Sequence, residues 1–128
     1  EIPEAALVIE SREVMDNLIS IHKLGAQVVI GDFGTGQASL NSLQRLPIAS
    51  IKIDKSLIST MGTNENHAIL VRSAINLAHN LGMKVISIGI ENSNIWHLVE
   101  GLQSDQAQGF LISAPLRPEE YLAWAASY

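Results

Sequence analysis

The feature that most limits how this chain can fold is a regular alternation between short apolar runs and segments with helical spacing. The apolar runs are rich in β-branched residues, which is typical of buried strands. We expect strands at 27–30, 49–54, 84–89 and 107–112. Helices are expected at 11–24, 39–46, 66–81, 94–102 and 119–126, the last with Pro118 at its start. This order predicts an α/β fold with a parallel sheet covered by helices, as a small open sheet or as half of an eight-unit barrel.

Composition limits the classes of function. The chain has 128 residues, 47% of them hydrophobic, which suits one domain with a single core. Thirteen acidic against eight basic residues give a net charge of −5, which argues against general nucleic-acid binding. The absence of cysteine excludes a disulfide, a thiolate zinc site and a cysteine nucleophile. With no long apolar run either, we expect no membrane span in this segment and a cytoplasmic location.

Polar motifs follow each expected strand, so the chemistry is expected on one rim of the sheet, where the carboxyl ends of parallel strands meet. Asp32 lies in GDFGTG, where glycines allow close approach of a ligand. It is a candidate cation ligand or acceptor for a guanine edge, and the alternative is an aspartate that caps the next helix.

Lys52 and Asp54 alternate with isoleucines in ASIKID, so they are expected to share one face of a strand. An ammonium group there suits a phosphate or an attacking water, and the alternative is a buried Lys–Asp pair.

Two further motifs end expected strands. Glu91 in IGIEN is a candidate metal ligand, with a helix N-cap partner as the alternative. Gln108, followed by Gly109 and Phe110, has the groups to bind and stack a purine base. The chain has four histidines, His22, His67, His79 and His97. They lie in expected helical segments without the spacing typical of metal ligands, so we expect them to lie on the surface or to pack against neighbours.

Taken in order, EIPEA, GDFGTGQASL, SIKIDKSLI, VISIGIEN and DQAQGFLISAPL resemble the second half of the EAL domain, the bacterial cyclic di-GMP phosphodiesterase family. The family versions read ExTES, DDFGTGxSSL, lKIDxxFv, vvAEGVEt and QGyl..xPl. The resemblance covers residues 1–128 as the C-terminal half of an EAL domain and implies half of a TIM-like barrel. The family uses Mg²⁺ or Mn²⁺ to hydrolyse cyclic di-GMP to pGpG.

The resemblance also implies roles for individual residues. Glu1 and Asp32 match metal ligands, and Glu4 matches the glutamate that steadies the loop beside the metals. The residues matched to catalytic positions are Lys52, Glu91 and Gln108. The candidate ligand-binding residues are Asp32, Gln108 and Phe110, of which Phe110 is chosen for its chemistry next to Gln108 and not for a family match.

Two departures from the family fall on hydrolysis. Gly31 stands where the family has a metal-bridging aspartate, and Ile88 stands where it has a catalytic glutamate. Glycine offers no carboxylate and isoleucine accepts no proton, so we expect a degenerate, catalytically inactive domain with no cofactor. Its expected role is that of a cyclic di-GMP receptor or a signalling interaction module.

The alternative is an active phosphodiesterase with an altered metal site. A degenerate domain that binds no nucleotide and acts only through a protein partner is a third reading. Expected partners include cyclic di-GMP, a protein partner, and GGDEF or sensor domains in a longer parent protein. Because half a barrel exposes two strand edges, we also expect pairing with a second copy or with the missing half, or else poor solubility.

Overall fold

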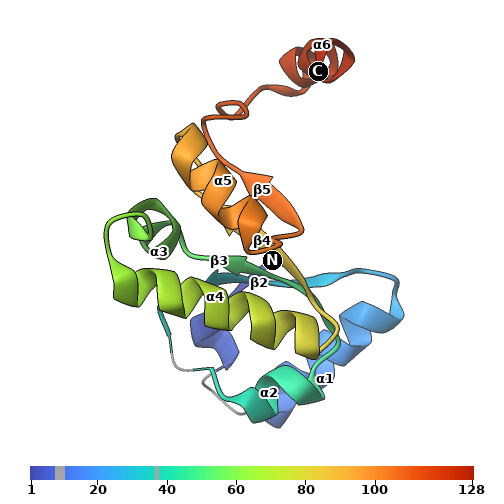
Figure 1. The fold of residues 1–128 in the computed structure, drawn as a ribbon. Helices are drawn as coiled ribbons and strands as arrows, with labels where there is room; N and C mark the ends of the chain where they lie inside the picture. The colour runs from blue at the N-terminus through green and yellow to red at the C-terminus, as the bar shows by residue number, and fades with distance from the viewer. Residues whose placement is uncertain (8–10, 37) are drawn as a thin grey trace.

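The computed structural model describes residues 1–7, 11–36 and 38–128 and confirms the α/β class. Its centre is a parallel five-stranded sheet in the order β1-β2-β3-β4-β5 (Figure 1). The strands are β1 (Ile2–Pro3), β2 (Val28–Phe33), β3 (Ile48–Ile53), β4 (Lys84–Ile88) and β5 (Gln106–Gln108). Neighbours in the chain are neighbours in the sheet, so all carboxyl ends lie on one rim.

Helices follow the strands, and polar side chains fix where several of them begin. They are η1 (Glu4–Leu7, a 3-10 turn), α1 (Arg12–Lys23), α2 (Leu40–Arg45), α3 (Lys55–Thr60), α4 (Glu65–Asn80), α5 (Ser93–Gly101) and α6 (Pro118–Ser127). The side chains of Ser39, Asp54, Asn64 and Asn92 accept backbone N–H groups at the starts of α2, α3, α4 and α5. Such caps satisfy donors that a helix leaves free in its first turn.

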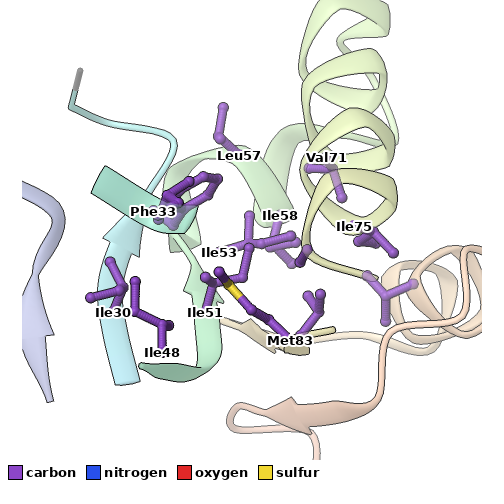
Figure 2. Close-up of a cluster of buried hydrophobic side chains, with 14 of the residues drawn as sticks. Ile30, Phe33, Ile48, Ile51, Ile53, Leu57, Ile58, Val71, Ile75 and Met83 are labelled. Carbon is purple, nitrogen blue, oxygen red and sulfur yellow. The ribbon is translucent and has the colours of Figure 1, made fainter. Parts of the chain in front are cut away.

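One face of the sheet carries the hydrophobic core. Ile30, Ile51 and Ile53 are essentially inaccessible to solvent, and they lie in the same cluster as Ile58 of α3 and Ile75 of α4 (Figure 2). The side chains between them in sequence point to the other face, as strand geometry requires. Lys52, Ile86 and Ile88 on that second face are only half-buried, so this face has solvent access near the rim.

The expected last strand is wrong in its extent. The prediction placed it at 107–112, whereas β5 is only Gln106–Gln108. The chain turns at Gly109, whose carbonyl accepts from the N–H groups of Ile112 and Ser113. A Cβ at Gly109 would lie 2.1 Å from the Ile90 carbonyl oxygen, so the glycine permits a close backbone approach that ends the strand.

Helix α6 extends away from the sheet at the end of an irregular segment (Figure 1). None of its residues is buried, and the ring of Trp124 contacts that of Tyr128, the residue after the helix, with the two ring centroids 4.8 Å apart. Within the described part of the chain, no helix is long and apolar enough to cross a membrane.

Candidate functional site

The rim at the carboxyl ends of the strands brings together side chains far apart in sequence. Glu1 precedes β1, Lys52 lies in β3, and Gln108 ends β5. The Lys52 ammonium donates to the Glu1 carboxylate at 2.8 Å and lies 3.4 Å from the Gln108 side-chain oxygen. Three of the predicted site residues therefore form one connected polar group. The predicted alternative of a buried Lys52–Asp54 pair is wrong.

Asp54 has a different place from the one expected. It lies just after β3 and caps α3, where its carboxylate accepts from the Ser56 N–H at 2.8 Å and from the Ser56 hydroxyl. The expectation of a shared strand face with Lys52 fails because β3 ends one residue earlier, at Ile53. The short helix α3 was not predicted, since the two apolar side chains within it, Leu57 and Ile58, are adjacent in sequence and show no helical spacing.

Gly31 explains how Glu1 reaches Lys52. A Cβ built on Gly31 would lie 2.3 Å from one oxygen of the Glu1 carboxylate, so Glu1 occupies the space that a side chain at position 31 would need. An aspartate at position 31 would force the Glu1 side chain to move. The Glu1 carboxylate of this ion pair thus occupies space left open by the residue that departs from the family pattern.

A second lysine, which the sequence analysis did not identify, holds the other rim glutamate. The Lys55 ammonium lies 2.5 Å from the Glu91 carboxylate. Gly89 has φ +81, and a Cβ there would lie 2.5 Å from the Lys55 side chain, so the aliphatic part of Lys55 lies against this glycine. Asn92 caps α5, so the interpretation of Glu91 as an N-cap partner is wrong.

Asp32 is the penultimate residue of β2, where the pairing with β3 is irregular and the chain enters a tight turn. It is exposed with φ 53, and its carbonyl accepts from the Thr35 N–H at 3.3 Å and from the Thr35 hydroxyl at 2.7 Å. The next helix, α2, is capped by Ser39, so the prediction that Asp32 caps it is wrong. The Asp32 carboxylate does not belong to the Glu1–Lys52–Gln108 group.

The glycine-rich loop after β2 is held by Glu4. This carboxylate is 4% exposed and accepts from the N–H groups of Gly34 at 3.1 Å, Gly36 at 2.7 Å and Ala38 at 3.4 Å. Gln37 of the same motif lies outside the described residues. Several donors on one buried carboxylate fix the loop backbone, which agrees with the loop-steadying role implied by the resemblance.

Phe110 lies two residues after Gln108 and is 68% exposed. An exposed aromatic ring can stack on a planar base, and a side-chain amide can form hydrogen bonds to the edge of a base. Gln108 and Phe110 thus have the side-chain chemistry that recognition of a nucleobase needs.

The carboxylates at this rim do not fit a pair of divalent cations. Position 31 has no side chain, the half-buried Ile88 is apolar, and the carboxylates of Glu1 and Glu91 are each paired with a lysine. Across residues 1–7, 11–36 and 38–128, no group of three or more acidic, histidine or cysteine side chains is placed to hold a metal ion. Oxygen-rich coordination by several carboxylates is what Mg²⁺ and Mn²⁺ need.

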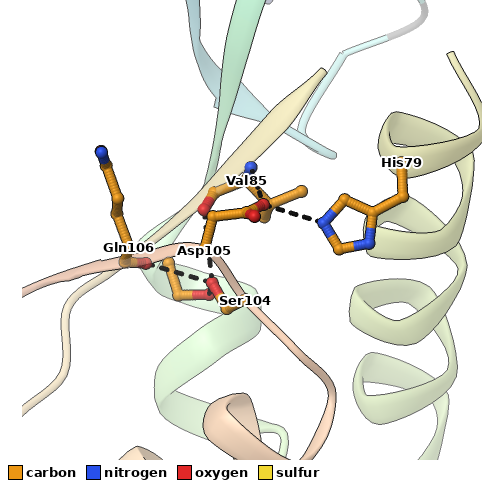
Figure 3. A network of polar contacts seen from close by, with 6 residues as sticks. His79, Val85, Ser104, Asp105 and Gln106 are labelled. Carbon is orange, nitrogen blue, oxygen red and sulfur yellow. Dashed lines mark hydrogen bonds and ion pairs between the residues drawn. The ribbon is translucent and has the colours of Figure 1, made fainter. Parts of the chain in front are cut away.

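A polar network at the opposite end of the strands is structural. Asp105 accepts from the Val85 N–H at 2.8 Å and lies 2.8 Å from the His79 ring of α4 (Figure 3). Burial raises the pKa of Asp105, but the hydrogen bonds from His79 and from the Val85 backbone outweigh burial and hold the pKa below its ordinary value of 3.8. All four histidines lie in helices as predicted, in α1, α4 and α5.

Comparison with known proteins agrees with this architecture. The chain is 32% identical over 124 residues to cyclic di-GMP phosphodiesterase PA2567 of Pseudomonas aeruginosa, and it covers 21% of that protein's length. Among solved structures it is similar to the PaMucR phosphodiesterase in complex with c-di-GMP, with a TM-score of 0.90 and 28% identity over 94% of this chain and 49% of that one.

This chain is also similar to the EAL domain of DcpA from Mycobacterium smegmatis. Its TM-score is 0.88 at 32% identity, over 98% of this chain and 56% of that one. The five-stranded sheet is therefore part of a larger TIM-barrel-like domain, since this chain spans about half of each solved structure. The protein-family model for the EAL domain matches residues 1–115, so the chain belongs to the EAL domain family.

Proposed function

We propose that this chain is part of a catalytically inactive EAL domain that binds cyclic di-GMP without metal and reports it within a signalling protein. The similarity to a phosphodiesterase solved in complex with c-di-GMP supports the choice of ligand. Because the chain spans only about a fifth of the curated relative's length, the rest of the parent protein, including GGDEF or sensor domains, is part of this proposal.

One observation supports the loss of hydrolysis most strongly: Gly31 and Ile88 lie at the two rim positions where a carboxylate is needed. Hydrolysis of a phosphodiester needs cations that cancel charge and a base that activates water. A small shift of neighbouring side chains supplies neither group. We therefore assign Lys52, Glu91 and Gln108 to ligand contact instead of bond cleavage.

Other features at the rim support retention of a ligand site. The glycine-rich loop is fixed by Glu4, Gln108 is oriented beside Lys52, and the Phe110 ring is open to solvent. Stacking and hydrogen bonds to a guanine base need no cation. A nucleotide-binding surface can therefore outlast the loss of the metal ligands.

Two measurements on the full-length protein test this proposal. Isothermal titration calorimetry with cyclic di-GMP in EDTA is expected to show saturable binding, and incubation with cyclic di-GMP and Mn²⁺ is expected to yield no pGpG. Clear production of pGpG would replace the proposal with the active phosphodiesterase that has an altered metal site. No heat of binding under any metal condition would indicate a module that acts only through a protein partner.

A further inference from the structure

The carboxylates of Glu1, which precedes β1, and of Glu91, which follows β4, are each neutralised from within the chain. Lys52 is paired with Glu1 at 2.8 Å, and Lys55 is paired with Glu91 at 2.5 Å. The Lys52 side chain is 21% exposed, so its pair with Glu1 is partly shielded from water. An ion pair in that setting is screened less than one on an open surface.

Glycines make both pairs possible. Gly31 leaves the space that the Glu1 carboxylate occupies, and Gly89 lets the side chain of Lys55 pass close to the backbone on its way to Glu91. A side chain at position 31 would collide with the Glu1 carboxylate, and a side chain at position 89 would collide with the aliphatic part of Lys55. The arrangement of lysines and glutamates thus follows from local backbone features of this chain.

We infer that the ammonium groups of Lys52 and Lys55 take the place of divalent cations as the counter-charges of this rim. A divalent cation bound by Glu1 or Glu91 would first have to displace a lysine. Gly31 and Ile88 supply no carboxylate to compensate for that loss. The inference predicts that the rim does not take up Mn²⁺ and that two substitutions restore uptake.

The consequence for the ligand rests on the proposed function. A phosphodiester would contact Lys52, with the Glu1 carboxylate moving aside, and no metal would bridge ligand and protein. The affinity for cyclic di-GMP is then the same in Mn²⁺ as in EDTA. The metal titrations below contain no nucleotide, so their outcome is independent of whether cyclic di-GMP binds.

The first experiment adds the missing carboxylates. Mn²⁺ binding to the full-length protein is followed by electron paramagnetic resonance for the wild type, the Gly31→Asp/Ile88→Glu variant and the matched Gly31→Asn/Ile88→Gln variant. The amide variant has the same side-chain sizes without the charges. We expect Mn²⁺ binding at the rim only in the carboxylate variant, with circular dichroism used to check that all three proteins fold.

The second experiment removes a lysine instead. Lys52→Met leaves the Glu1 carboxylate without its counter-charge, whereas Lys52→Arg keeps a positive group. We expect the Met variant to bind Mn²⁺ at the rim at least about tenfold more tightly than the limit that the wild type sets, and the Arg variant to show no binding, like the wild type. This comparison stands even where the double variants fail to fold.

Two results would overturn the inference. One is Mn²⁺ binding by the wild type at the rim, abolished by Glu1→Gln. The other is an unchanged Mn²⁺ affinity in both the carboxylate variant and Lys52→Met. Loss of cyclic di-GMP binding alongside the expected Mn²⁺ results would reject the proposed function and leave this inference in place.

Discussion

Glu4 offers the sharpest test of how the rim is held in shape. Its buried carboxylate accepts two close hydrogen bonds, from Gly34 and Gly36, and a longer one from Ala38. A hydrogen bond to a charged group contributes about 1.5–3 kcal/mol, and water can refill part of the site because the two loop glycines are exposed. We expect Glu4→Ala to lower the free energy of unfolding by about 3 kcal/mol.

Glu4→Gln separates charge from shape. The amide keeps one oxygen acceptor and turns a donor toward the other loop N–H groups, so we expect a loss of about 1.5 kcal/mol. Urea denaturation measures both losses, and amide hydrogen exchange at Gly34 and Gly36 reports whether the loop opens locally. Glu13→Gln, on the exposed first turn of α1, is the matched control and is expected to cost about 0.3 kcal/mol. If Glu4→Gln costs no more than the control, and exchange in the loop is unchanged, the reasoning is refuted.

Three further predictions concern the sheet. Asp105→Asn weakens the contact with His79. Because the folded-state pKa of Asp105 lies below its ordinary value, the carboxylate stabilises the fold at pH values above that ordinary value. The difference in the free energy of unfolding between the wild type and Asp105→Asn, measured in urea, therefore shrinks as the pH falls through the folded-state pKa. Gly109→Ala forces a Cβ against the Ile90 backbone and is expected to cost more than about 2 kcal/mol, whereas Gly101→Ala, with nothing within 4 Å, is neutral or stabilising. The open edges of β1 and β5 predict association of the isolated 128-residue chain, which a stable monomer in light scattering would contradict.

Much of the fold follows from sequence because its signals are local. Runs of β-branched residues predicted β2, β3 and β4, and apolar residues at helical spacing predicted α1 and α4. Each prediction lies within a few residues of the observed bounds. The position of the polar rim followed from the rule that parallel strands share one carboxyl end. By contrast, β1 is two residues long, so it has no period to detect.

The contacts that could not be predicted from the sequence join residues whose spacing follows no repeat. The Lys55–Glu91 pair joins residues 36 positions apart, and it requires Lys55 to lie against Gly89. The His79–Asp105 contact spans 26 positions between a helix and a turn. Neither pair matches a helical or strand repeat, so only the tertiary arrangement reveals them.

The most direct test of the central claim is a crystal of the full-length protein soaked with Mn²⁺ and cyclic di-GMP, measured at an X-ray energy where manganese scatters anomalously. We predict cyclic di-GMP at the carboxyl ends of the strands and no anomalous peak beside Glu1, Asp32 or Glu91. A pair of manganese peaks at this rim, with Lys52 and Lys55 turned away from the two glutamates, would contradict the account.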